Sequence, residues 1–157
     1  MQKITTCLWF DGKVEEAINF YTSVFKNSKL TSISYYGEGT HMPPGTVLTA
    51  TLIIEDQEIM ILNGGPVFKL NEVVSLVVNC KTQEEVDFYW DTLSADGGEE
   101  SQCGWLKDKF GLSWQIVPSI IFEILQGKDS KKANNVMSAV MQMKKLDISV
   151  LEQAAKQ

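Results

Sequence analysis

The sequence has few of the residues that metal and redox sites use most often: one histidine and three cysteines in 157 residues. Cys7, Cys80 and Cys103 are odd in number and scattered, so they predict neither a disulfide framework nor a structural zinc site. Unpaired cysteines are typical of a reducing compartment, and we expect a cytoplasmic protein.

Long hydrophobic runs and an excess of positive charge are also missing. No apolar stretch approaches the roughly 20 residues that cross a bilayer, and a strand predicted near the N-terminus leaves no room for a signal peptide. The net charge is −6, whereas nucleic-acid binding requires a positive surface that displaces counterions. We therefore expect neither a membrane nor a nucleic acid as a partner.

What the sequence does contain is a pattern that occurs twice. An apolar strand over residues 3–10 leads into helical spacing over 13–25, and a strand over 73–79 leads into a second such helix. The copies share one constant offset, at which Leu8 matches Leu76, Glu16 matches Glu84, Phe20 matches Phe88 and Tyr21 matches Tyr89. A duplicated unit can enclose a pocket between its copies, so we expect the binding site there.

Each copy continues with three further strands. In the first copy these are predicted at about 30–36, 46–54 and 58–63, with a glycine- and proline-rich loop at 37–45; in the second, at 99–101, 103–107 and 112–117. The fold class is therefore α+β, with two βαβββ modules at about 1–66 and 71–118 forming one domain. A C-terminal helical extension follows at 119–157, expected to pack on the sheet or on a second subunit.

Helix starts are predicted from capping residues. Asp11 is a candidate N-cap of the first helix, and Thr82 with Glu85 has the spacing of a capping box for the second. Asp129 and Asp147 are candidate caps of two helices in the extension.

The chain resembles the vicinal oxygen chelate superfamily, which includes glyoxalase I, bleomycin-resistance proteins and extradiol dioxygenases. It is most similar to the PhnB-like branch, often labelled 3-demethylubiquinone-9 3-methyltransferase-like. The segments that carry the resemblance are Cys7–Gly12, Leu62–Pro66, Asn71–Leu76 and, above all, the tryptophan-rich Gln102–Pro118. The resemblance implies paired modules in a cupped mixed sheet, commonly in a homodimer.

The resemblance also implies four positions for metal ligands, one on the first strand and one, usually Glu, on the last strand of each module. In this sequence the first-strand windows are Thr5–Cys7 and Val73–Ser75, and the last-strand positions are Ile61 or Asn63, and Gln115. None is a histidine or a carboxylate, so we predict no metal and no cofactor. His41 lies in the long loop, where a solvated surface role is expected and a lid is the alternative.

A set of aromatic and amide side chains then remains for a flat or aromatic small organic ligand. The predicted ligand-binding residues are Trp9, Asn63, Gln102, Cys103, Trp105, Trp114 and Gln115. The alternative for each tryptophan is a place in the core, and for Cys103 a structural role rather than that of a nucleophile.

Three hypotheses for function follow. The first is a metal-free small-molecule-binding protein; the second is a divalent-metal-dependent glyoxalase-like lyase, isomerase or dioxygenase; the third is an interaction protein that docks a partner through residues 119–157. Methyltransferase activity is not supported, because Gly64-Gly65 and Gly97-Gly98 lack the strand-to-helix context of a nucleotide-binding turn.

Overall fold

A computed structural model describes residues 3–157, which group into two compact units: residues 3–70 and Asn71–Gln157. The boundary falls between the two predicted modules. Residues 119–157, predicted as an extension of a domain at 1–118, group with the second module. Among the described residues, no helix is long and apolar enough to cross a membrane.

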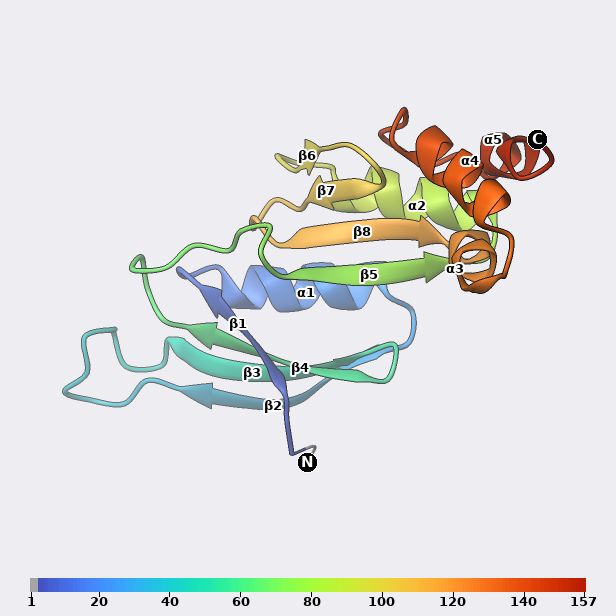
Figure 1. Cartoon of the computed structure of the whole chain (residues 1–157). Helices are drawn as coiled ribbons and strands as arrows, with labels where there is room; N and C mark the ends of the chain where they lie inside the picture. Colours follow the sequence, from blue (N-terminus) through green and yellow to red (C-terminus); the bar gives the residue numbers. More distant parts are fainter. Residues whose placement is uncertain (1–2) are drawn as a thin grey trace. The chain divides into compact units, whose positions relative to one another are not determined.

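Unit 1 is a four-stranded sheet with one helix (Figure 1). Along the chain it contains β1 (Thr6–Phe10), α1 (Val14–Val24), β2 (Ser28–Tyr35), β3 (Val47–Ile54) and β4 (Gln57–Asn63). The strand order is β1-β4-β3-β2; β1 runs parallel to β4, and the other pairs are antiparallel. The predicted βαβββ order is confirmed.

Burial alternates along the strands because one face of the sheet packs against α1. Ala50, Leu52 and Ile54 of β3 and Ile59 and Ile61 of β4 are buried, whereas the residues between them are half-buried. On the helix, the buried residues are Val14, Ala17, Ile18, Tyr21 and Val24, which recur at helical spacing. We call the opposite face of each sheet its distal face.

Unit 2 repeats this topology with shorter strands. It contains β5 (Ser75–Cys80), α2 (Gln83–Leu93), β6 (Glu99–Glu100), β7 (Trp105–Lys107) and β8 (Ser113–Pro118), in the sheet order β5-β8-β7-β6. Again the first strand runs parallel to the last, and the other pairs are antiparallel. Leu106, Trp114 and Ile116 are buried beneath Val86, Trp90 and Leu93 of α2.

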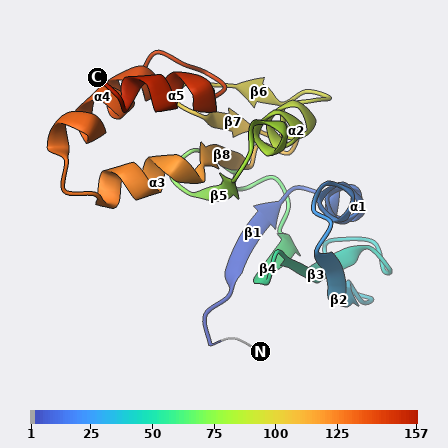
Figure 2. The same cartoon turned by 90° about the vertical axis from the view of Figure 1, so that its right-hand side faces the viewer.

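The helical extension completes unit 2. It consists of α3 (Ser119–Gln126), α4 (Ser130–Val140) and α5 (Ile148–Ala154), with α4 and α5 side by side (Figure 2). Its core is a cluster of buried residues: Val117, Ile121, Ile124, Val136, Val140, Leu146 and Leu151. The expectation that the extension packs on the sheet is met through Val117, the last residue but one of β8.

Helix capping agrees with the sequence at three positions and differs at one. Thr82, Asp129 and Asp147 each accept a hydrogen bond from a backbone N–H in the first turn of α2, α4 and α5. The Glu85 carboxylate accepts from the Lys81 amide rather than from that of Thr82. Asp11 does not cap α1: the N-cap is Lys13, in a left-handed conformation with φ 54° and without a side-chain cap.

Candidate functional site

Strand register defines the distal face of the sheet in unit 2, which we call sheet 2; the sheet in unit 1 is sheet 1. Ser75 pairs with Ser113, and Ser113 with Lys107, while Gln115 pairs with Trp105. Paired residues, and residues two apart on a strand, share a face. Because Trp114 and Leu106 face α2, all five of these side chains lie on the distal face.

Two side chains on this face are hydrogen-bonded to each other, and a third has no partner. The Gln115 amide donates through Nε2 to Ser75 Oγ over 2.9 Å. Ser113, which pairs with Ser75, is buried, and its hydroxyl has no hydrogen-bond partner within residues 3–157. A buried hydroxyl without a partner is unfavourable.

Lys107 forms an ion cluster at the edge of the same face. Its Nζ lies 2.9 Å from Glu99 Oε2 and 3.1 Å from Glu72 Oε1. Hydrogen bonds that Lys107 donates to Glu99 and Glu72 raise the pKa of Lys107, while a backbone hydrogen bond and Lys107 lower the pKa of Glu72. Lys107 is therefore already paired with two carboxylates.

Trp105 differs from the other three tryptophans in its hydrogen bonding. The indole N–H of Trp9 donates to Gly65 O, that of Trp90 to Glu100 Oε1, and that of Trp114 to Asp108 Oδ2. Among the described residues, the half-buried Trp105 alone has an indole N–H without an acceptor. Its ring and its donor are both available to a ligand.

The distal face of sheet 1 carries different residues at matching positions. Cys7 pairs with Met60 as Ser75 pairs with Ser113, so Leu62 corresponds to Gln115. The sequence-based choice of Ile61 or Asn63 for this position was wrong: both face α1, because a shift of one residue reverses the face of a strand. Leu62 offers no polar atom to a ligand.

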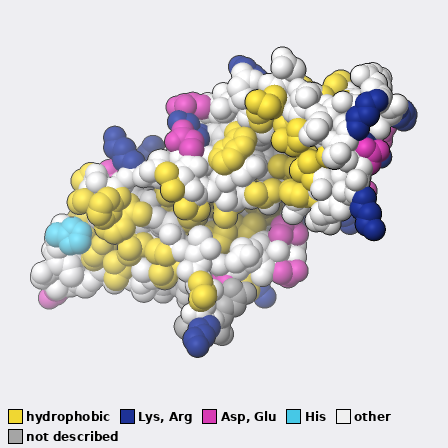
Figure 3. Space-filling model, in the orientation of Figure 1, with side chains coloured by type: hydrophobic (Ala, Val, Ile, Leu, Met, Phe, Trp, Pro, Cys, Tyr) yellow, Lys and Arg dark blue, Asp and Glu magenta, His cyan; other side chains and the backbone are white. Residues whose placement is uncertain are grey.

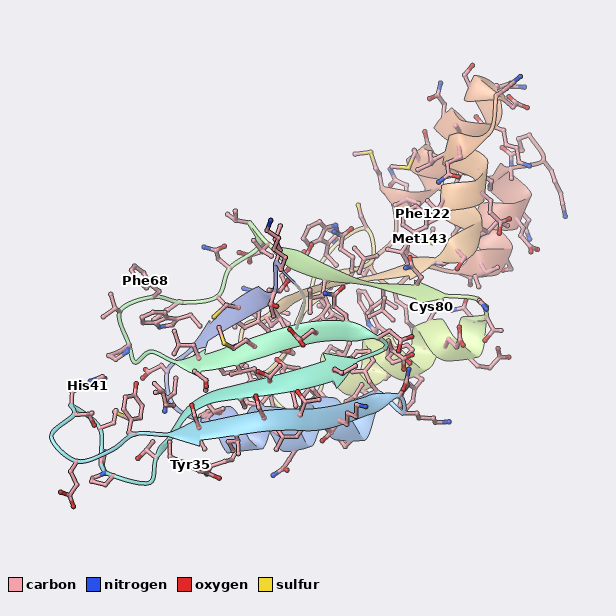
Figure 4. All side chains as sticks on the ribbon, turned by 90° about the horizontal axis from the view of Figure 1, so that it is seen from below. Tyr35, His41, Phe68, Cys80, Phe122 and Met143 are labelled. Carbon is pink, nitrogen blue, oxygen red and sulfur yellow. The ribbon has the colours of Figure 1, made fainter. Side chains whose placement is uncertain are left out.

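Trp9 lies on the distal face of sheet 1, where its own unit holds it in place. Its N–H donates to Gly65 O over 2.8 Å, and its ring lies so close to Gly64 that a Cβ there would lie 2.3 Å from the ring. Phe68 packs edge-on at 5.0 Å between ring centroids and projects from the segment after β4 (Figure 4). Trp9 therefore offers a ring surface and no free donor.

Asn63 and Trp114, both predicted to bind ligand, lie in the cores of their units. Asn63 accepts from the Gly12 amide and donates to Val47 O. Trp114 is 2% exposed and donates to Asp108, whose carboxylate also accepts from two amides of the β7–β8 turn. Their polar groups are used in organising each unit, so we leave both out of the proposed site.

Gln102 and Cys103 lie in a turn before β7 rather than on a strand. Cys103 has φ 61°, and the Trp105 amide donates back to Gln102 O. The predicted strand at 103–107 therefore begins only at Trp105. Gln102 is exposed and Cys103 half-buried, in contact with the core of the extension.

The remaining reactive side chains do not gather at a site. Desolvation raises the pKa of Cys80 to about 12, with a smaller contribution from Glu85, and partial burial raises that of the more exposed Cys7, so both are thiols at neutral pH. His41 lies in the loop between β2 and β3, at the left of Figure 3, with its ring 5.3 Å from that of Tyr36.

Comparison with known proteins identifies the family. The family described as 3-demethylubiquinone-9 3-methyltransferase matches residues 2–117. The chain belongs to this family. A Bacillus cereus PhnB protein, described as a candidate 3-demethylubiquinone-9 3-methyltransferase, is 40% identical over 74% of this chain and 99% of its own, with a TM-score of 0.68. No curated protein matches.

More distant structures share the fold of this 3-demethylubiquinone-9 3-methyltransferase family member. Protein PA1353 of Pseudomonas aeruginosa is 19% identical over 75% of this chain and 98% of its own, with a TM-score of 0.61. The fosfomycin resistance protein FosX of Listeria monocytogenes is 16% identical over 74% and 93%, with a TM-score of 0.53. The vicinal oxygen chelate fold expected from the sequence is confirmed.

The residues of this family member do not fit the metal that the fold implies. One FosX structure contains Mn(II). In this chain, the positions where the resemblance implies metal ligands carry Cys7 with Leu62 and Ser75 with Gln115. Neither pair contains histidine or carboxylate, and the Gln115 amide directs an N–H at Ser75. Within residues 3–157, no three His, Cys, Asp or Glu side chains gather as a metal site would require.

Proposed function

We propose that this protein binds a small organic molecule on the distal face of sheet 2, by ring stacking and hydrogen bonding rather than through a catalytic metal. The observation that supports the proposal most directly is Trp105. Its indole N–H has no acceptor among the described residues, and it lies in register with Gln115.

The chemistry of this face favours a flat ligand that carries a hydrogen-bond acceptor. The Trp105 ring provides a stacking surface, and its N–H provides one donor. Gln115 directs Nε2 toward Ser75, which leaves its amide oxygen available, and the buried hydroxyl of Ser113 lies on the residue paired with Ser75. Lys107, enclosed by two carboxylates, is a poor partner for an anion.

The methyl transfer in the family's name receives no support from this architecture. Nucleotide cofactors of doubly wound proteins bind at the carboxyl ends of an open parallel sheet. Each sheet here has one parallel pair, and its other pairs are antiparallel.

Two bicyclic compounds of the same shape test the proposal. Quinoline has a ring nitrogen that can accept from an indole N–H, whereas naphthalene has none. With 5-fluorotryptophan incorporated, quinoline should shift the ¹⁹F resonance of Trp105, assigned from Trp105→Phe, and naphthalene should shift it less. Gln115→Leu, which reproduces the residue found at Leu62, removes the amide that lies in register with Trp105 and should weaken the response to quinoline.

Gln142→Leu, an exposed glutamine of the extension, is the matched control and should bind both compounds as the unaltered protein does. Equal shifts with quinoline and naphthalene, or an unchanged response in Gln115→Leu, would contradict the proposal.

Metal analysis after purification without chelators separates this proposal from the divalent-metal lyase, isomerase or dioxygenase of the same fold. Stoichiometric manganese, zinc, nickel or iron, lost in Ser75→Ala and Gln115→Leu, would replace our proposal with that enzyme. The homodimer and the cytoplasmic location remain predictions; light scattering of the purified protein tests the first.

A further inference from the structure

The helical extension lies outside the region shared with the family. The family match ends at residue 117. The alignment with the Bacillus cereus protein includes 99% of that protein but only 74% of this chain. Residues 119–157 are therefore an addition to a complete pair of modules, and they are built into unit 2 through polar contacts as well as their apolar core.

Backbone hydrogen bonds join the extension to the turn that precedes Trp105. The Cys103 amide donates to Met143 O over 2.7 Å, and the Gly104 amide donates to Lys144 O over 2.8 Å. Both acceptors belong to the segment between α4 and α5. On its other side, Gly104 O accepts from the Ile116 amide, so the turn is held between the extension and β8.

The conformation of this turn needs such support. Cys103 and Gly104 have successive positive φ angles of 61° and 81°. A non-glycine residue in this region is strained by roughly 1 kcal/mol or more, and it persists only where its surroundings hold it. Leu146 packs against Gly104 so closely that a Cβ there would lie 3.0 Å from Leu146 Cδ1 and 2.9 Å from Ile116 O.

Gln83 holds the segment between α4 and α5 against α2. Its Nε2 donates to Leu146 O over 3.2 Å and to Asp87 Oδ1 over 3.1 Å, while its Oε1 accepts from the Ile148 amide over 2.9 Å. Nearby, Lys145 Nζ lies 3.0 Å from Asp87 Oδ1 and 3.3 Å from Asp91 Oδ1. The Gln83 side chain thus holds the backbone on both sides of Asp147, at Leu146 and at Ile148.

From these contacts we infer that the extension positions Trp105, with Gln83 and Leu146 as the positioning residues. They fix the segment at 143–146, this segment fixes the strained turn at 102–104, and the turn sets where β7 begins and where the Trp105 ring lies. The inference rests on the proposed function for its biological meaning, because Trp105 is the central residue of the proposed site.

The test uses the full-length protein with Gln83→Ala and, as a matched control on the extension itself, the exposed Gln153→Ala. In Gln83→Ala, the amides of Cys103 and Gly104 should exchange with solvent roughly five- to tenfold faster, as loss of a hydrogen-bonded anchor predicts. The ¹⁹F resonance of Trp105 should broaden or move, and its response to quinoline should weaken. Gln153→Ala should leave all three measurements unchanged.

Gln83→Glu is a second variant for the same measurements, in which the contact with the Ile148 amide can remain. The carboxylate can still accept from the Ile148 amide, but it cannot donate to Leu146 O and is repelled by the Asp87 carboxylate, so its effect should be at least as large as that of Gln83→Ala. Faster exchange at Cys103 and Gly104 with an unchanged Trp105 resonance would overturn the inference and leave the proposed function intact. A moved Trp105 resonance, with quinoline and naphthalene indistinguishable in the unaltered protein, would instead refute the proposed function alone.

Discussion

The two units share one topology, yet they are stabilised and equipped differently. In unit 1, β2 and β3 each extend over eight residues, whereas in unit 2 the corresponding β6 and β7 have two and three. The short sheet of unit 2 is supplemented by the core of the extension. The two units thus have the same order of strands, but only unit 2 adds the helices of the extension to its core.

The distal faces diverged as well. Matching positions carry Cys7 and Leu62 in unit 1 but Ser75 and Gln115 in unit 2. In addition, the indole N–H of Trp9 is used within its unit, and that of Trp105 is not. The difference teaches that two copies of one topology can carry different side chains at matching positions.

The largest expected effect concerns the buried polar residue that organises unit 2. Asp108 accepts from the Phe110 and Leu112 amides and from the Trp114 indole, so Asp108→Ala leaves these three donors, two of them buried, without their carboxyl acceptor. We expect unfolding, measured with urea, to become easier by roughly 3–5 kcal/mol. Asp108→Asn keeps an acceptor and should lose less; a loss below about 1 kcal/mol in Asp108→Ala would contradict this account.

The buried polar side chain of unit 1 is Asn63, and its removal should cost less because Asn63 is a neutral amide. Asn63→Ala removes the partners of the Gly12 amide and of Val47 O. We expect a loss of about 2–3 kcal/mol in the free energy of unfolding. The same change at the exposed Asn79 is the control and should alter stability by less than about 0.5 kcal/mol.

Capping provides a sharper contrast between the units, because α2 has a side-chain cap and α1 has none. Thr82→Ala should reduce stability by about 1 kcal/mol, since the Glu85 amide loses its acceptor. Asp11→Ala should change it by less than about 0.5 kcal/mol. Equal losses in the two variants, measured by thermal unfolding, would show that Asp11 caps α1 in solution.

The smallest effect is a pH dependence specific to unit 2. Hydrogen bonds from Lys145 and Gln83 lower the pKa of Asp87 below its ordinary 3.8. When folding lowers the pKa of a carboxyl group, the ionised group stabilises the fold at pH values above its pKa in the unfolded protein. This stabilisation is lost as the pH falls through its pKa in the folded protein. The stability difference between the protein and Asp87→Asn should therefore be constant from pH 5 to 8, begin to fall as the pH approaches 3.8, and vanish only below the lowered pKa of the folded protein. Because the pair is solvent-exposed, we expect at most about 0.5 kcal/mol, reduced by salt.

The sequence could predict whatever depends on local pattern. The βαβββ order and the caps at Thr82, Asp129 and Asp147 follow from periodicity and hydrogen-bonding chemistry within a few residues. The predictions were wrong where a shift of one residue changes the face of a strand or the point at which the strand begins. Asn63 was assigned to the wrong face, and Cys103 to a strand instead of a turn.

The sequence by itself determined the duplication, the fold family and the absence of histidine and carboxylate at the expected metal positions. Only the tertiary structure decided which tryptophan retains a free indole N–H, because acceptors such as Gly65 O, Glu100 and Asp108 are brought to the other three by folding. It also decided that the extension holds the turn before Trp105. Backbone contacts between residues about 40 apart, such as Cys103 with Met143, leave no periodic trace in a sequence.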